Sequence, residues 1–298
     1  MTITPGTPAT SSTTSSAGRV WFITGASRGL GRAFTEAALA AGDRVVAVAR
    51  TLTALEQLAA EHGDCLLALP LDVTDRAAVR TTVDEAVRHF GRLDIVVNNA
   101  GFLTMGMVEE FSEAEARAQM ETNFFGALWV GQAVMPQLRA QGSGHIVQVS
   151  SIGALGGFAL TGMYSASKFA LEGMSEALAA EASRFGIKVT IVEPGGYWTD
   201  LYTTGMAATE PMDAYAPLRA ELEKQFADGS VDSMPHLAAE AVMKLVDSDD
   251  PPLRLLLGSA IYDLAFDISR QRMATWAAWE ETSRAAEQAT EAPEGYGS

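Results

Sequence analysis

The chain of 298 residues is 48% hydrophobic and 19% charged, a composition that supports a large core and excludes global disorder. Its formal net charge of −16 argues against nucleic acid and anionic membranes as partners, because both bind clustered lysine and arginine. No apolar run is long enough to span a membrane. The length fits one large α/β domain or two small ones.

The single cysteine bears on the compartment. Cys65 has no partner for an intramolecular disulfide, so a reducing and therefore cytoplasmic location is expected. It lies in the strand-like run DCLLALPLDV, where we expect a small buried hydrophobe. The four histidines are scattered and lack metal-ligand spacing, so the sequence predicts no metal site.

The two ends differ from the middle of the chain. Residues 1–18 are rich in Ser, Thr and Pro and lack the basic start and apolar centre of a signal peptide, so they predict a disordered leader. Residues 281–298 predict a weakly ordered acidic tail. No linker interrupts residues 19–260, which favours a single domain over residues 19–280.

Short apolar runs alternate with longer helical stretches between the two ends. The runs are continuous in Val, Ile and Leu, as expected for strands that helices cover on both faces. Strands are expected at 19–25, 43–50, 65–73, 93–101, 144–151, 187–196 and 253–259, and helices at 30–41, 51–63, 75–91, 112–141 and around Tyr164.

This alternation predicts an α/β fold. It indicates a doubly wound, Rossmann-like parallel sheet of six to seven strands with helices on both faces. Ligands in such sheets bind beyond the carboxyl ends of the strands. The unusual residues of this chain follow those strand ends.

The stretch TGASRGLG follows the first expected strand and opens a helix. Gly25, Gly29 and Gly31 permit a tight turn, close approach of the backbone to a phosphate and close helix packing. The start of the helix offers unpaired N–H groups to the anion. The spacing Gly-x-x-x-Gly-x-Gly departs from the commoner Gly-x-Gly-x-x-Gly dinucleotide pattern.

The second expected strand indicates which dinucleotide binds. It ends in Ala49 and Arg50, where an NAD site would normally place an acidic residue for the ribose hydroxyls. Arg28 lies in the glycine stretch. Two guanidinium groups suit a 2′-phosphate, because arginine can hold phosphate oxygens in bidentate fashion. NADP(H) is therefore favoured over NAD(H), the alternative being that both are ordinary surface arginines.

The stretch MYSASK places Tyr164 and Lys168 four residues apart, and so on one helix face. A phenol has a pKa of about 10, which a nearby ammonium lowers by stabilising the phenolate. The pair could then act as a general acid or base. Most Tyr-x-x-x-Lys pairs, however, are only a half-buried aromatic beside a surface lysine.

With these residues in place, the chain resembles the short-chain dehydrogenase/reductase family in its single-domain form. The resemblance covers about residues 19–257 and rests on TGASRGLG, LDVT, NNAG, SS ahead of YSASK, and PGGYWT, in the family's order. It implies an NADPH-dependent carbonyl reductase or alcohol dehydrogenase acting on a hydrophobic ketone or secondary alcohol. Two alternatives are an NAD-dependent alcohol dehydrogenase and a catalytically silent nucleotide-binding regulator.

The resemblance also implies the site residues. Tyr164 would exchange a proton with the substrate oxygen, Ser151 would orient that oxygen, and Lys168 would bind the nicotinamide ribose and support the phenol. Asn123 would hold a water beside the lysine, and Ser150 is the less favoured neighbour of Ser151. The implied cofactor residues are Gly25, Ser27, Arg28, Gly29, Leu30, Gly31, Arg50, Asp72, Val73, Asn99, Ala100, Gly101, Tyr164, Lys168, Pro194, Gly195 and Thr199.

Family substrate pockets are lined by the loops after the fourth, fifth and sixth strands. A hydrophobic substrate is implied by the side chains in those loops, although each could instead be core. The long connection at about 200–232 is expected to be a lid. The implied pocket residues are Phe102, Leu103, Met105, Gly153, Leu155, Phe158, Met163, Tyr197 and Trp198.

Helices at about 112–140 and 162–185 resemble the pair that forms the family's dimer contact. A homodimer or homotetramer is therefore expected. Trp276 and Trp279, three residues apart, suit packing on the body or on a partner subunit. Small residues line one face of the second helix: Ala166, Ala170, Gly173 and Ala177.

Overall fold

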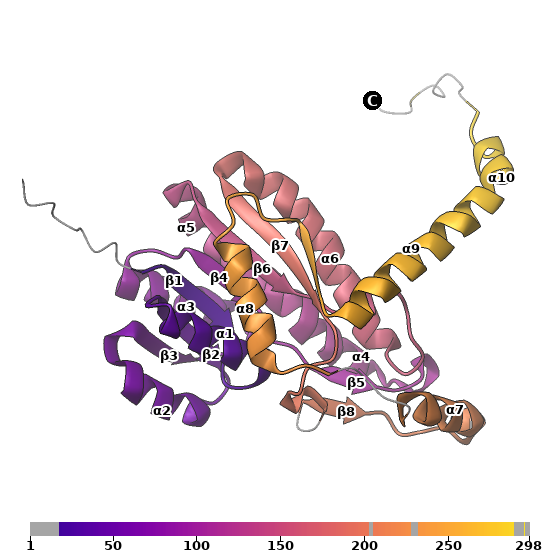
Figure 1. The fold of residues 1–298 in the computed structure, drawn as a ribbon, viewed down its shortest axis with the longest axis horizontal. Coiled ribbons are helices and arrows are strands. Elements are labelled where there is room, and N and C mark those ends of the chain that lie inside the picture. Colours follow the sequence, from indigo (N-terminus) through magenta and orange to yellow (C-terminus); the bar gives the residue numbers. More distant parts are fainter. Residues whose placement is uncertain (1–17, 203–204, 228–231, 289–294, 296–298) are drawn as a thin grey trace, which may run out of the picture.

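The computed structural model describes residues 18–202, 205–227, 232–288 and 295. Its centre is a seven-stranded parallel sheet in the order β3-β2-β1-β4-β6-β7-β9 (Figure 1). The expected doubly wound fold is confirmed, and the strand order reverses between β1 and β4, where such sheets bind ligands. The strands are β1 Val20–Thr24, β2 Arg44–Ala49, β3 Leu66–Pro70, β4 Ile95–Asn98, β6 Gly144–Val149, β7 Ile187–Pro194 and β9 Arg254–Leu257.

Helices cover both faces of this sheet. Trp21 and Ile23 of β1 pack in one apolar cluster, whereas Val20 and Phe22 pack in the other. Neither face of the strand meets water, which explains its continuous apolar sequence. The first cluster lies under α1 Gly29–Ala40, α2 Thr53–His62 and α8 Pro235–Val246, and the second under α3 Arg76–Phe90, α5 Gly126–Gln141 and α6 Gly162–Ala182.

The helix expected over 112–141 is interrupted. It consists of α4 Glu113–Met120, a π-helical turn over Glu121–Phe125, and α5. Ser112 begins α4 with a capping box, in which its hydroxyl and the Glu115 side chain each bind the other's backbone N–H. The π-turn carries Asn123, so the interruption falls at a residue of the expected site.

A second, two-stranded sheet was not expected. β5 Leu103–Met105 pairs in parallel with β8 Met206–Ala208, and this pairing ties the expected lid to the loop after β4. A strand of three residues carries too short a pattern to be predicted from sequence. Residues 203–204 and 228–231 of the expected lid lie outside the described residues.

A buried carboxylate strengthens this connection. The side chain of Glu110 is fully buried and forms an ion pair with Arg219 of α7 Ala216–Ala227. It also accepts hydrogen bonds from Thr209 Oγ1 at 3.0 Å and from Met212 N at 2.9 Å. The Arg219 guanidinium holds the pKa of Glu110 well below its usual range. The segment is therefore fastened by a charge that persists at neutral pH.

The C-terminal helix leaves the body. α9 Ser259–Ala278 extends away from the sheet and is followed by α10 Glu280–Ala285 (Figure 1). The tail expected from residue 281 therefore begins within α10, so its first residues form a helical turn. Residues 289–294 and 296–298 of that tail, and 1–17 of the expected leader, lie outside the described residues.

Cys65 corrects a second expectation. It is exposed, because it ends the 3₁₀ turn Gly63–Cys65 and β3 begins one residue later, at Leu66. The apolar run DCLLALPLDV therefore contains the strand but does not begin with it.

Candidate active site

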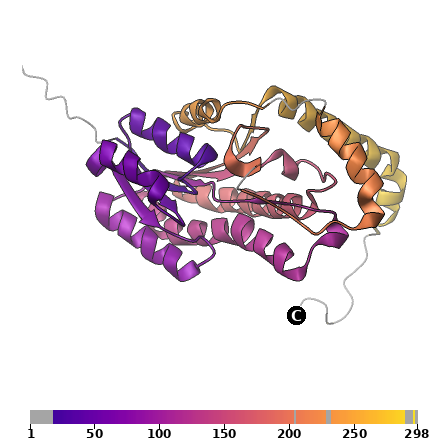
Figure 2. The same cartoon turned by 90° about the horizontal axis from the view of Figure 1, so that it is seen from below.

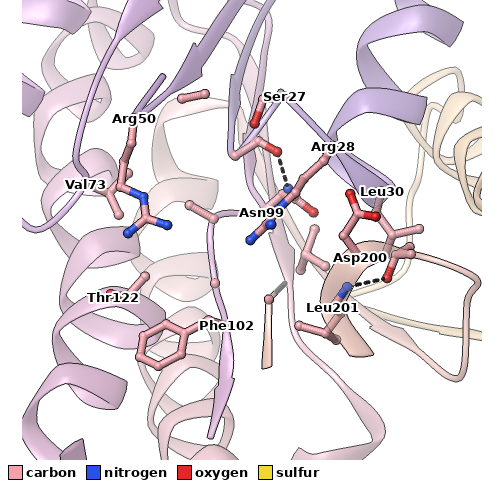
Figure 3. A pocket seen from close by; sticks show the side chains of 18 of the residues that line it. Ser27, Arg28, Leu30, Arg50, Val73, Asn99, Phe102, Thr122, Asp200 and Leu201 are labelled. Carbon is pink, nitrogen blue, oxygen red and sulfur yellow. Dashed lines mark hydrogen bonds between the residues drawn. The ribbon is translucent and has the colours of Figure 1, made fainter. Parts of the chain in front are cut away.

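A cavity of about 750 Å³ lies along the carboxyl ends of the strands, within the usual size of small-molecule sites. Residues from the turns after β1, β2, β3, β4 and β7 line it together with α6 (Figure 3). Fifteen of the implied cofactor residues lie in its wall: Gly25, Ser27, Arg28, Gly29, Leu30, Arg50, Asp72, Val73, Asn99, Ala100, Gly101, Tyr164, Lys168, Pro194 and Thr199.

Gly31 and Gly195, the other two implied cofactor residues, lie outside this wall. A Cβ on Gly31 would lie 2.3 Å from the carbonyl oxygen of Gly25, and one on Gly195 would lie 2.6 Å from the Ile261 side chain. Glycine at both positions permits close packing beneath the cavity and makes no direct contact with it.

Arg28 and Arg50 both reach the cavity. In Figure 3 the Arg50 guanidinium points into it beside Val73. Arg50 directly follows β2, whose last residue is Ala49, so the wall carries a positive charge where an NAD site would carry an acid. The charge pattern expected from the sequence is therefore retained in space.

Lys168 is buried at the inner end of the cavity. Its Nζ donates to the carbonyl oxygen of Val149 at 2.9 Å and lies 5.7 Å from the centre of the Tyr164 ring. Burial lowers the pKa of Lys168 to about 8, and the negative charge of Glu172 opposes part of this shift. The ammonium is therefore close enough to stabilise a phenolate at Tyr164.

Asn123 is 1% exposed and held on both sides of its amide. Its Oδ1 accepts from Phe102 N at 3.0 Å, and its Nδ2 donates to Phe102 O at 3.0 Å and to Ser167 Oγ at 3.1 Å. A Cβ on Gly101 would lie 3.2 Å from Asn123 Oδ1 and 3.8 Å from Lys168 Nζ. The missing side chain at Gly101 thus leaves space between the asparagine and the lysine.

The two adjacent serines have different surroundings. Ser150 lines the cavity, but its hydroxyl donates to Glu172 Oε1 at 2.6 Å. Ser151 is buried outside the cavity wall, and its Oγ accepts from Gly153 N at 3.1 Å. The Ser151 hydroxyl proton is therefore not committed to that bond, which keeps Ser151 available as a donor.

A cluster of charged groups lies behind these serines. Glu193 of β7 is fully buried, and its Oε1 lies 3.2 Å from Arg254 Nε. Arg254 also pairs with Glu172 at 3.1 Å and with Glu176. Burial, helped by the charge of Glu172, raises the pKa of Glu193 to about 7. Nothing in the sequence pattern indicated this cluster.

Most of the implied substrate residues lie outside the cavity wall. None of Leu103, Gly153, Leu155, Phe158, Tyr197 and Trp198 is in its wall. Tyr197 belongs to the apolar core, while Trp198 and Phe158 are exposed. Gly153 packs against the Tyr164 ring, because a Cβ on Gly153 would lie 3.2 Å from ring atoms of Tyr164. Phe102 does line the cavity, as the sequence indicated, and Met105 and Met163 do not.

Several wall residues were not expected. The only sequence signal for these residues is their position in the chain: each is next to an expected residue or lies in the expected lid. They include Thr51, Thr122, Asp200, Leu201, Gly205, Met206 and Ala207.

Comparison with known proteins identifies the family. Residues 19–209 match the family described as short chain dehydrogenase. The chain is 40% identical over 271 residues to "Oxidoreductase BOA17" of Botryotinia fuckeliana, covering 90% of this chain and 98% of the relative. The chain belongs to the short-chain dehydrogenase/reductase family and is a short-chain oxidoreductase.

Two solved structures agree. A short-chain dehydrogenase from Streptomyces avermitilis is 40% identical with a TM-score of 0.84, covering 90% of this chain and 100% of that one. A short chain dehydrogenase from Burkholderia cenocepacia in complex with NADP is 27% identical with a TM-score of 0.70, covering 88% and 97%.

The family binds NAD or NADP, and the residues present fit such a group. Gly25 and Gly29 have positive φ values of 64° and 54°, and Cβ atoms there would lie 3.0 Å from Ala100 and 3.2 Å from Thr199, so the turn has a shape that favours glycine. The N-cap of α1, Arg28, makes no side-chain cap hydrogen bond, which leaves the first N–H groups of the helix to an anion.

Among the described residues, no helix has the length and apolar character needed to cross a bilayer. No cluster of three or more His, Cys, Asp or Glu side chains in this part of the chain could hold a metal ion.

Proposed function

We propose that this oxidoreductase is an NADPH-dependent carbonyl reductase that acts on hydrophobic ketones, with secondary alcohols as substrates in reverse. One observation carries the proposal: a single cavity is lined both by Arg28 and Arg50 and by Tyr164 with Lys168 beside it. The first pair suits a 2′-phosphate, and the second suits proton exchange with a carbonyl oxygen.

The chain's own residues supply position and a proton. When bound, the nicotinamide provides the hydride that carbonyl reduction requires. Tyr164 gives its phenolic proton to the substrate oxygen, and Lys168 stabilises the phenolate that remains. Ser151 donates a hydrogen bond that orients the same oxygen. Asn123 lies on the far side of the Gly101 gap from Lys168 and holds a water that returns the proton.

The cofactor preference has its own support. The NADP complex of the Burkholderia cenocepacia relative shows that this family's fold accepts a 2′-phosphate. In the present chain Arg50 follows β2 directly. A charge-assisted hydrogen bond contributes about 1.5–3 kcal/mol, which corresponds to roughly 10- to 150-fold in affinity.

A paired titration tests the proposal. NADPH and NADH are added to wild type, Arg50→Ala and Arg88→Ala while tryptophan fluorescence is followed. Arg88, in the last turn of α3, is the matched control. We expect NADPH to bind wild type more tightly than NADH, and Arg50→Ala alone to lose that preference. Equal binding, or preference for NADH, would instead favour an NAD-dependent alcohol dehydrogenase.

The substrate class rests on the expected lid. Leu201, Gly205, Met206 and Ala207 line the cavity from that segment, and they are apolar or small. We propose that a hydrophobic substrate enters beside them, above Tyr164. A catalytically silent regulator would bind nucleotide without turning over any ketone, so a screen of aromatic and aliphatic ketones with NADPH separates the two.

Assembly and location complete the proposal. Ala166, Gly173 and Ala177 of α6 are exposed in the single chain, and we propose that this small-residue face packs on a second copy in a homodimer or homotetramer. The single cysteine supports a cytoplasmic location.

A further inference from the structure

α9 extends away from the sheet (Figures 1 and 2), and an apolar stripe lies exposed along it. Tyr262, Phe266, Met273 and Trp276 are 55%, 47%, 56% and 64% exposed. Their sequence spacing keeps them on one face of the helix, and exposed Ser269 occupies the gap in the middle. Apolar side chains gathered in this way mark an interaction surface.

The body uses a different face of α9. Ile261 and Ala265 are buried, a Cβ on Gly156 would lie 3.3 Å from Ile268, and Arg272 donates to Leu155 O at 2.9 Å. Each of these four residues precedes a stripe position by one, which is about 100° around the helix. The stripe is therefore left over after α9 has made its contacts with its own chain.

We propose that the stripe pairs with the same stripe of a second copy of this chain, antiparallel, with Ser269 of both copies at the crossing. The stripe is nearly symmetric about Ser269. Reversing one helix sets Tyr262 against Trp276 of the second copy and Phe266 against its Met273. A two-fold axis then makes each contact twice.

The charges beside the stripe are compatible with the same arrangement. Asp267 and Arg270 flank the stripe and form an ion pair within α9. In the antiparallel pair, Arg270 comes within one helical turn of both Asp267 and Arg270 of the second copy, so each guanidinium has carboxylates of both copies near it to offset the like charge. Ala274 and Ala277, on the same flank, leave room for the helices to approach.

The area suits a modest affinity. Aromatic side chains bury roughly 150–250 Å² each, so covering the exposed halves of both stripes removes on the order of 1,000 Å² from water, near the lower limit for specific interfaces. The α9 contact therefore adds to the α6 face proposed above and involves none of its residues.

Cysteine cross-linking tests the register. Cys65 is the only native cysteine and is exposed, so the test uses Cys65→Ser with Ser269→Cys, oxidised by glutathione disulfide. We expect a cross-linked dimer on a non-reducing gel, because disulfides form only where Cα atoms come within about 7 Å. Gln271→Cys, exposed on the opposite side of α9, is the matched control. Equal cross-linking of the two variants would overturn the proposal.

Charge reversal tests the pairing independently. Arg270→Asp is expected to weaken the association at least fivefold in sedimentation velocity, and Asp267→Arg with Arg270→Asp to restore it. Failure of the double variant to restore association would contradict the antiparallel register. If the protein binds phosphatidylcholine vesicles and the Ser269→Cys variant forms no cross-link, the stripe contacts a lipid surface and the proposal is wrong.

Discussion

The two halves of the sheet differ in the types of residue that they bury. β1 and β2 bury Val, Ile, Ala, Trp and Phe together with one threonine, and the turn above them is shaped by glycine. β6 and β7 bury His145, Gln148, Thr190 and Glu193. The helix packed on them, α6, adds Lys168 and Glu172 to the polar groups hidden there.

The difference follows from what each half must hold. A dinucleotide needs backbone N–H groups and space, which glycine supplies without side-chain chemistry. Proton exchange needs charged groups removed from water, because only there do their pKa values move far. The polar half therefore loses some of the stability that an apolar core would provide, and single substitutions should separate the two halves.

The largest effect is expected in the catalytic half. Tyr164→Phe removes the proton donor and keeps the ring, so we expect kcat for ketone reduction to fall by about 10²–10⁴-fold. NADPH affinity should stay within about twofold, as measured by fluorescence titration. Substantial turnover by this variant would show that Tyr164 is not the general acid.

In the cofactor half, Gly31→Ala should act through packing. Its Cβ would lie 2.3 Å from Gly25 O, and such overpacking costs roughly 1–3 kcal/mol. Urea denaturation should show this loss together with weaker NADPH binding. Gly157→Ala is the control, because nothing lies within 4 Å of the place of its Cβ and its φ is not positive, so it should lose neither stability nor NADPH affinity. Equal effects would contradict a glycine-shaped turn.

The buried carboxyl of β7 makes stability depend on pH. The pKa of Glu193 is raised to about 7, so the folded protein binds the extra proton and this contribution to stability is lost as pH rises from about 4.5 to 7. Glu193→Gln should therefore be more stable than wild type at pH 8 and similar to it at pH 5.

Comparing wild type with Glu193→Gln isolates the effect of the Glu193 carboxyl. Burial lowers the pKa of His145 to about 4, so its contribution falls as pH drops from about 6.5 to 4 and has the opposite sign. Both proteins retain His145, so its effect cancels in the difference between their urea midpoints. A difference that does not change with pH would contradict the buried charge.

The smallest effect is expected from Glu172→Gln. The carboxylate helps to keep Lys168 protonated, so its loss should move the Lys168-dependent limb of the kcat profile to lower pH. Glu176→Gln is the control, because Glu176 pairs with the same Arg254 but is exposed. If both variants shift the profile equally, the effect arises from Arg254 and Glu172 has no role of its own.

Local patterns allowed much of this molecule to be predicted. The glycine turn, Arg50 and the Tyr164–Lys168 pair each depend on residues close in sequence, and the structure brings them to one cavity. Other features depend on distant partners. Glu193 gives no signal until Arg254 and Glu172 are in place, and β8 is a strand only because β5 lies beside it.

The substrate side was the least predictable for the same reason. Trp198 is exposed and Tyr197 is core, although they are neighbours in an apolar stretch. Only the path of the chain after β7 distinguishes them, and that path is fixed by the pairing of Tyr197 with Ser233.

The π-turn at Glu121–Phe125 has a consequence for insertions and deletions in this chain. A π-turn accommodates one residue more than the α-helix around it. Deleting one residue there would let the helix close into a regular α-helix while α5 keeps its orientation relative to α4. Val130, Val134 and Leu138, now buried, would stay in the core, and the change would fall on the backbone around Asn123. A one-residue deletion within α5 itself is not absorbed in this way and would rotate the residues after it by about 100°.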